Sequence, residues 1–153
     1  MATTISNATL TVTLTEAVTL NGTAQGSTNT LSLPNIDEIS KRIVTVPTSE
    51  KSIISFHASD IGPGTFLEGD VRYVRITNKD DANFVILNIE GDASTDFSVR
   101  LDAGVSYIIA STIDGTGVVD YIDITGATLE DMATIKATAD TSAVDLEIFV
   151  ASV

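Results

Sequence analysis

The sequence predicts an all-β protein, either an antiparallel β-sandwich of the jelly-roll kind or a closed barrel. About ten short segments alternate between apolar and polar residues, and turn residues gather between them every 8–12 residues or so. No long stretch repeats its apolar residues with the 3.6-residue period of an amphipathic helix. At 153 residues without a recognisable linker, the chain is expected to form one domain over residues 1–153.

The N-terminal region has the most regular alternation. Threonines occupy every second position of the first part of residues 8–20, and Leu10, Val12 and Leu14 lie between them. Successive side chains of a strand point to opposite faces, so this segment is predicted to be a strand with one wet face. Terminal strands can pair with the edge of a neighbouring molecule, so residues 1–20 are a candidate docking or exchanged strand.

Turn residues dominate the next segment. Asn21-Gly22 is predicted to end the first strand, and residues 23–29 are predicted to form a loop. Leu31 and Leu33 begin a short strand. Pro34 must end that strand or confine it to a sheet edge, because proline has no N–H for a sheet ladder.

Two further strands are predicted at residues 42–46 and 52–56, on either side of a turn that begins at Pro47. Residues 59–64 contain Ser, Asp, two Gly and a Pro, and they give the strongest loop signal in the chain.

A β-hairpin is predicted at the middle of the chain. Residues 71–78 and 83–90 are rich in β-branched and aromatic residues, and the polar segment Lys79–Ala82 separates them. Alternation places one set of apolar side chains from both runs in the core: Val74, Ile76, Val85, Leu87 and Ile89.

The C-terminal half continues the strand pattern, at residues 97–101, 105–109, 118–124, 135–139 and 144–150. Only residues 128–134 have some helical character. In the last strand, four apolar side chains are predicted to face inward: Val144, Leu146, Ile148 and Val150.

Charge and cysteine content exclude several classes of function. Eight Lys and Arg against 21 Asp and Glu give a net charge of −13, which opposes binding to nucleic acid and to anionic membranes. No run approaches the roughly 18 apolar residues of a membrane span, and no secretory leader is recognisable. Without cysteine, disulfides, thiolate catalysis and cysteine zinc sites are ruled out.

No catalytic residue is predicted. His57 is the only histidine, and Ser59 and Asp60 follow it directly. A catalytic triad needs three side chains that converge in space, usually from distant positions, and neighbours in one loop do not provide that. The favoured interpretation of His57 is a histidine at the end of a strand.

No metal or cofactor is expected either. The acidic turns follow no EF-hand spacing, and Asp and Gly are common in turns for backbone reasons alone. The only weak calcium candidates are Asp114, Asp120 and Asp123.

Aromatic residues are few: no Trp, three Tyr and five Phe. Most are expected to pack inside the protein, but aromatic residues are also enriched at interfaces. The candidate interface residues, with those of the first strand, are Leu10, Val12, Leu14, Tyr73, Phe84, Tyr107 and Tyr121.

Four segments resemble small virion proteins encoded by tailed bacteriophages, particularly those that infect marine bacteria and cyanobacteria. They are residues 39–48, 71–85, 97–108 and 137–151, and the resemblance covers the C-terminal two-thirds of the chain in addition to residues 39–48. It implies a non-enzymatic virion component present in many copies, in contact with other virion proteins and itself a homo-oligomer. No catalytic residue is carried over from it.

Two classes of virion protein compete. The first is a structural subunit, either a capsid decoration or cement protein or another auxiliary piece of the head or neck. The second is a tail-tip or fibre module involved in host attachment. The low aromatic content and the absence of Trp favour the first class. An enzyme that acts on cell-wall polymer would need an acid/base pair, and the sequence offers none.

Overall fold

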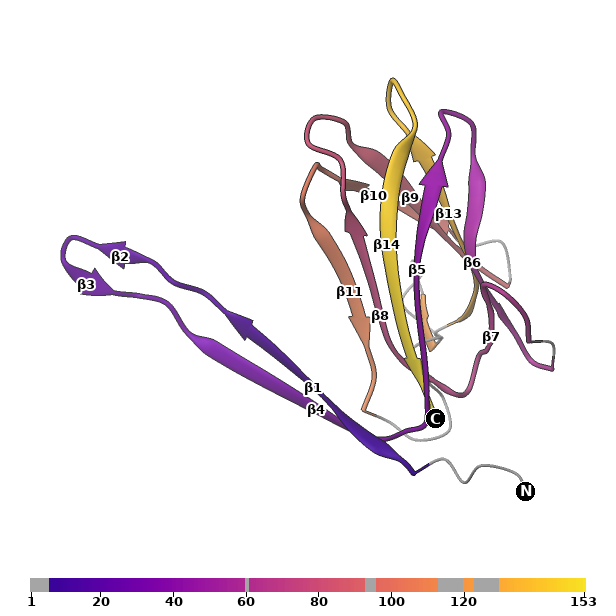
Figure 1. Cartoon of the computed structure of the whole chain (residues 1–153), viewed down its shortest axis with the longest axis horizontal. Helices are drawn as coiled ribbons and strands as arrows, with labels where there is room; N and C mark the ends of the chain where they lie inside the picture. Colours follow the sequence, from indigo (N-terminus) through magenta and orange to yellow (C-terminus); the bar gives the residue numbers. More distant parts are fainter. Residues whose placement is uncertain (1–5, 60, 93–95, 113–119, 123–129) are drawn as a thin grey trace. The chain divides into compact units, whose positions relative to one another are not determined.

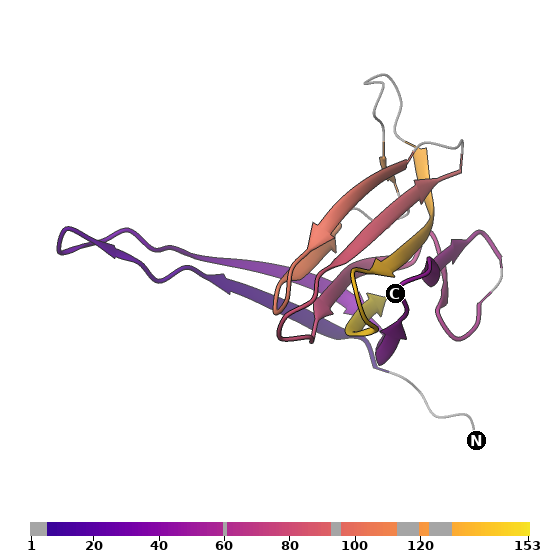
Figure 2. The ribbon, with the colours of Figure 1, turned by 90° about the horizontal axis from the view of Figure 1, so that it is seen from above.

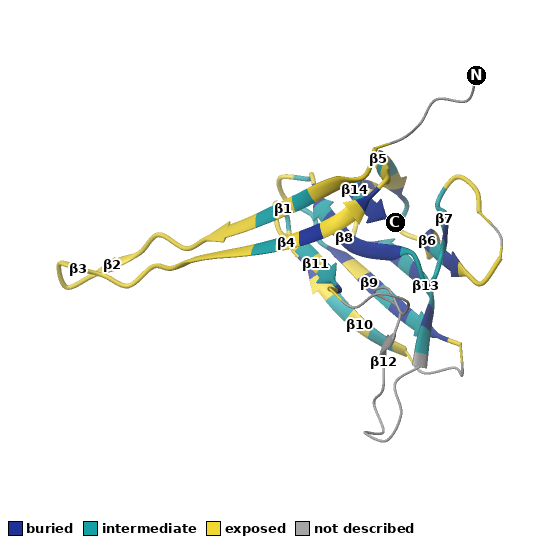
Figure 3. Cartoon of the chain, turned by 90° about the horizontal axis from the view of Figure 1, so that it is seen from below, coloured by how far each residue is buried: buried dark blue, intermediate teal, exposed yellow. Residues whose placement is uncertain are grey.

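The computed structural model describes residues 6–59, 61–92, 96–112, 120–122 and 130–153. Within this part every regular element is a β-strand, which confirms the all-β prediction. The chain divides into two compact units, Met1–Asp37 and Glu38–Val153. Figure 1 shows the strands, and it labels all of them except β12, which is labelled in Figure 3.

The first unit is a two-stranded antiparallel ribbon, and its two long strands run side by side in Figures 1 and 2. A shorter hairpin forms its tip. The strands are β1 (Ala8–Thr15), β2 (Thr19–Leu20), β3 (Thr23–Ala24) and β4 (Thr28–Ile36). We call residues 8–36 the ribbon.

The tip of the ribbon turns at Asn21-Gly22. Both residues have positive φ, 50° and 79°, as a type I′ hairpin turn requires, and Asn-Gly is the pair that most favours this turn. The turn brings Leu20 opposite Thr23. The loop predicted for residues 23–29 is therefore only partly right: residues 25–27 lie outside strands, but residues 23–24 belong to β3 and residues 28–29 to β4.

Pro34 lies inside β4, at an irregularity in the pairing. Ala8 faces Ile36 and Leu10 faces Leu33, so β4 has one residue more than β1 between these pairs. Asn35 has a positive φ of 63° at this bulge. A bulge on a two-stranded sheet tolerates proline, because the N–H that proline lacks would not have made a hydrogen bond to an inner strand.

The second unit is a β-sandwich of two sheets. The four-stranded sheet has the order β11-β8-β14-β5, and the other sheet has the order β10-β9-β13-β6-β7, with β12 also beside β13. All neighbours are antiparallel except β6 and β7. The strands are β5 (Glu38–Val46), β6 (Lys51–His57), β7 (Thr65–Leu67), β8 (Val71–Asn78), β9 (Val85–Gly91), β10 (Asp96–Leu101), β11 (Ser106–Ala110), β12 (Asp120–Ile122), β13 (Glu130–Ala139) and β14 (Val144–Ser152).

The predicted central hairpin is wrong, although both of its strands exist. β8 and β9 belong to different sheets, and each has both edges occupied by other strands. The polar segment between them crosses from one sheet to the other. Asn78 and Asp80 support this crossing, since Asn78 Nδ2 donates to the carbonyl of Asn83 at 2.9 Å and Asp80 Oδ1 accepts from the N–H of Asn83 at 2.7 Å.

The core lies between the two sheets, and the predicted inward faces are confirmed. All the inward residues predicted for 71–90 and 144–150 are at most 1% exposed. Residues from the six-stranded sheet complete the same cluster, among them Ile54, Leu101, Met132 and Ile135. The segment with some predicted helical character is instead the start of β13, as far as it is described.

Candidate interaction surface

The ribbon has one apolar face and one hydroxyl face. Residues directly opposite each other in an antiparallel pair lie on the same face. The pairs Leu10–Leu33 and Val12–Leu31 form the apolar face, and Leu14 continues it. The alternate pairs are all hydroxyl residues: Thr11–Ser32, Thr13–Thr30 and Thr15–Thr28. The alternation seen in the sequence therefore holds on both strands.

The outer part of the ribbon is exposed on both faces. Every residue from 13 to 30 is exposed, as the colouring of Figure 3 shows. Leu14, Val18 and Leu20 are each more than half exposed. Leu10 and Val12, the other two interface candidates on β1, are half-buried.

The ribbon is almost uncharged. Glu16 is the only acidic or basic residue before Asp37, in a chain with 8 Lys and Arg and 21 Asp and Glu. The backbone N–H of Glu16 donates to the carbonyl of Ser27 at 2.8 Å, and its carboxylate accepts from the Ser27 hydroxyl at 2.9 Å. At Gly26 the strands approach so closely that a Cβ atom would collide with the Glu16 carbonyl. Glycine at position 26 therefore allows the two strands to lie this close together.

The outer face of the four-stranded sheet is the second notable surface. Register places Lys41, Phe149, Arg75 and Ile108 in one row across all four strands. The next rows on the same face include Ile43 with Glu147, and Ile39 with Ala151 and Tyr73. We call this surface the outer sheet face.

An ion-pair network holds the centre of the outer sheet face. Glu147 binds Arg75 at 2.7 Å through one oxygen and Lys41 at 3.2 Å through the other. The hydrogen bond from Arg75, followed by the one from Lys41, lowers the pKa of the Glu147 carboxyl. The guanidinium carbon of Arg75 lies 6.0 Å from the centre of the Phe149 ring. The network fixes these side chains. Asp145 lies on the same face, where it accepts the hydroxyl of Thr45 at 2.6 Å, so the two cations of this face are matched by two carboxylates.

Large apolar side chains surround this network. Ile39 and Ile43 on β5 are 57% and 64% exposed, and Ile108 on β11 is 45% exposed. The Phe149 ring is half-buried and meets Tyr73 edge-on, with 5.9 Å between the ring centres. Aromatic residues and arginine are enriched at protein interfaces, and here they lie beside exposed isoleucines.

The aromatic candidates do not form one site. Tyr73 is buried and only 4% exposed. The Phe84 ring lies 4.0 Å from the guanidinium carbon of Arg100, and Tyr107 lines an apolar cavity of about 290 Å³ with Ile89, Phe97 and Met132. Of Tyr121 only the backbone, in β12, is described.

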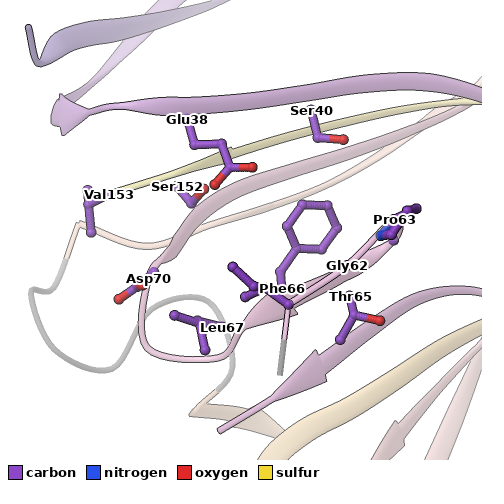
Figure 4. Close-up of a pocket in the computed structure, with 12 residues that line it drawn as sticks. Glu38, Ser40, Gly62, Pro63, Thr65, Phe66, Leu67, Asp70, Ser152 and Val153 are labelled. Carbon is purple, nitrogen blue, oxygen red and sulfur yellow. The ribbon is translucent and has the colours of Figure 1, made fainter. Parts of the chain in front are cut away.

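A larger cavity of about 420 Å³ lies beside β5, β7 and the C-terminal residues. Figure 4 shows Phe66 among its lining residues, with Glu38 and Ser40 on one side of the ring and Leu67 and Asp70 on the other. Its two carboxyl groups are those of Glu38 and Asp70. The lining residues therefore form a hollow at the protein surface, and they do not form a recognisable catalytic group.

Neither His57 nor the acidic turns form a reactive cluster among the described residues. His57 lies exposed at the end of β6, and its Nδ1 accepts the backbone N–H of Ser59 at 3.3 Å. In that described part, no three His, Cys, Asp or Glu side chains are placed to hold a metal ion. Of the calcium candidates, Asp114 and Asp123 lie outside the described residues, and only the backbone of Asp120 is described.

No protein-family model matches this chain, and no curated protein matches it. Among the described residues, no helix has the length and apolar character needed to cross a membrane.

Sequence reasoning missed the outer sheet face, although its signal was present. The strand predicted at 42–46 begins four residues earlier, at Glu38. In the longer strand, Ile39 and Ile43 alternate with Arg42 and Val44, so both faces of β5 carry apolar residues. A strand with two apolar faces at a sheet edge indicates a contact beyond its own core.

Proposed function

We propose that this chain is a non-enzymatic structural subunit of a bacteriophage virion, present in many copies. The specific role is that of a capsid decoration or cement subunit, or of another auxiliary head or neck component. The observation that carries the proposal is the ribbon, an exposed and nearly uncharged element with one apolar face. The resemblance of four segments to phage virion proteins supports the virion as the location.

A ribbon of this kind makes physical sense as an attachment element. An isolated two-stranded hairpin is marginally stable in water at best, because it buries too little apolar surface. Each residue from 13 to 30 is exposed, so these residues gain little from burial in the single chain. Docking on another protein would bury Leu14, Val18 and Leu20 and add the stabilisation that the hairpin lacks.

The sandwich supplies the complementary property, which is solubility. Nearly all of the acidic residues lie in Glu38–Val153, and a strong net charge keeps identical copies from associating at random. Contact is then restricted to surfaces of low charge. Partners would be other virion proteins and further copies of this chain, in a trimer or dimer closed by point symmetry.

The test is the incorporation of a chain that begins at Glu38 and therefore lacks the whole ribbon. Removing residues 1–15 alone would leave β4 as an unpaired edge, so the complete deletion is the cleaner change. Particles would be purified from cells that produce either the full chain or the truncated chain, and bound copies would be counted by quantitative mass spectrometry. Circular dichroism of the free truncated chain would check that the sandwich is folded.

The full chain is expected in many copies per particle, and the folded truncated chain is expected to be lost from particles. Full incorporation of the truncated chain would show that the ribbon is not needed for attachment to the particle, which would contradict the role proposed for it. A few copies per particle, together with binding of the isolated protein to host cells, would favour the tail-tip or fibre module instead.

A further inference from the structure

We propose that Asn21, at the tip of the ribbon, is a site of spontaneous deamidation, in which the backbone nitrogen of Gly22 displaces the side-chain amide nitrogen as ammonia. The reaction needs water and no enzyme. It leaves a carboxylate in the tip turn and, in part of the product, a longer backbone. This inference goes beyond the proposed function and does not depend on it.

The sequence singles out this asparagine. The backbone nitrogen of the following residue must reach the side-chain carbonyl carbon, and a side chain on that following residue obstructs the approach. Among the asparagines of the chain, only Asn21 precedes a glycine. The other two asparagines of the ribbon precede the β-branched residues Thr30 and Ile36, which crowd the backbone most.

The structure leaves the reacting groups accessible. Asn21 and Gly22 are both exposed, and a Cβ atom placed on Gly22 would meet no other atom within 4 Å. The pairing of Leu20 with Thr23 closes the turn, and the N–H of Gly22 is not part of that ladder. The nitrogen that must lose its proton is therefore not held by a hydrogen bond of the sheet.

The turn must open before the ring can close, and its opening costs little. A five-membered ring between the side chain of Asn21 and the nitrogen of Gly22 needs a different ψ angle at Asn21 from that of a type I′ turn. The hairpin that holds the turn has only two residues in each strand, and all four are exposed. Short hairpins of this kind are marginally stable, so the open form is well populated.

The reaction has two steps. In the first, the Gly22 nitrogen loses its proton and forms a bond to Cγ of Asn21. The bond from Cγ to Nδ2 then breaks, and Nδ2 leaves with that proton as ammonia, so that a succinimide remains. In the second step, water adds to one of the two ring carbonyls. Addition at Cγ gives an aspartate with a normal backbone, and addition at the main-chain carbonyl gives an isoaspartate.

Each product changes the tip of the ribbon in a different way. The aspartate adds a second carboxylate to an element whose only charged residue is Glu16, and Asp-Gly still favours the type I′ turn. The isoaspartate lengthens the backbone between Leu20 and Thr23 by one atom, so the two-residue turn no longer fits and their pairing is lost.

Mass spectrometry of the full chain after incubation tests the inference. The chain would be held at mildly alkaline pH, which favours loss of the backbone proton, and then cleaved after its glutamates to release residues 17–38. Fragmentation locates the mass gain from replacing an amino group with a hydroxyl group, and enzymatic methylation detects the isoaspartate. Asn35 in the same peptide is the internal control, because it is also exposed with a positive φ of 63° but precedes Ile36.

A second sample, denatured in guanidinium chloride, gives the rate for the open chain. Because the short hairpin opens easily, conversion of Asn21 in the folded chain is expected within about tenfold of that rate. Conversion of Asn35 is expected to be at least several-fold slower than that of Asn21 in both samples. A larger protection of Asn21 in the folded chain, or equal rates at Asn21 and Asn35, would overturn the inference.

The variant Gly22→Ala tests whether the nitrogen of residue 22 is the nucleophile. Gly22 has a positive φ of 79°, so alanine would strain the folded turn, and the comparison is made on denatured chains, where the turn plays no part. The added methyl group is expected to slow conversion of Asn21 several-fold. Equal rates in the two denatured chains would contradict the proposed reaction.

Discussion

At the scale of single residues, Asp80 shows how the chain uses its acidic turns. Its Oδ1 atom accepts the backbone N–H groups of Ala82 at 2.8 Å and Asn83 at 2.7 Å. These two hydrogen bonds, that from Asn83 first, lower the pKa of the carboxyl below its ordinary value of 3.8. The carboxylate thus holds the segment that connects the two sheets, a backbone role typical of Asp in turns.

Replacing Asp80 should therefore destabilise the protein in a way that depends on pH. Because the pKa is lower in the folded state, the carboxylate contributes stability above its ordinary pKa, and this contribution is lost as the pH falls through the folded value. Asp80→Ala is expected to lower the free energy of unfolding clearly at pH 7 and much less near pH 3, as measured by urea denaturation. The control is Asp81→Ala, at an exposed neighbouring position, which should change little at either pH. An equal loss for Asp80→Ala at both values would contradict this role.

At the scale of elements, β9 offers a sharp test of which face is buried. Leu87 is fully buried in the core, whereas its neighbour Ile86 is 43% exposed on the opposite face. Leu87→Asp should cost about 3 kcal/mol or more, because it buries a charge without a partner, and should prevent folding if the protein is no more stable than that. Ile86→Asp should stay within about 0.5 kcal/mol. Chemical denaturation of both variants measures the difference, and similar losses would place the strand in the opposite orientation.

The same elements show what periodicity can predict. Alternation correctly located the inward faces of β8, β9 and β14, because a strand with one buried face has apolar residues at every second position. It could not identify the neighbours of a strand. β8 and β9 follow each other closely in sequence, yet β8 pairs with β11 and β14, which come later in the chain. Pairing in a sandwich depends on contacts between distant segments, which a local pattern does not record.

The ribbon shows a second limit of what a periodic pattern can predict. Leu10, Val12 and Leu14 alternate with threonines as they would in a strand that covers a core, but Leu14 lies exposed. The apolar pattern thus predicted a contact without saying whether it is made within one chain. The Asn21-Gly22 pair did contain the information for a tight hairpin, and the strand residues 23–24 and 28–29 were mistaken for parts of a longer loop.

At the scale of the whole molecule, no metal is expected to contribute to stability. Chelator treatment should leave the melting temperature unchanged, as measured by differential scanning calorimetry. A fall of several degrees that calcium reverses would show ligand binding to the folded state and would turn attention to Asp114, Asp120 and Asp123.

Charged residues and buried apolar residues are distributed unequally between the two units. The sandwich carries the core and nearly all of the charge, and the ribbon carries exposed apolar residues with a single carboxylate. Under the proposed function, the charge of the sandwich would keep single copies apart and the ribbon would make the contact with the assembly.

The central claim is that the chain is a multi-copy structural subunit joined through its ribbon, and an averaged electron-microscopy image of particles containing it tests this most directly. The account predicts density for the sandwich at many symmetry-related positions, with the ribbon of each copy in contact with a neighbouring virion protein. Density restricted to a few copies at the tail tip, or a chain absent from purified particles, would contradict it.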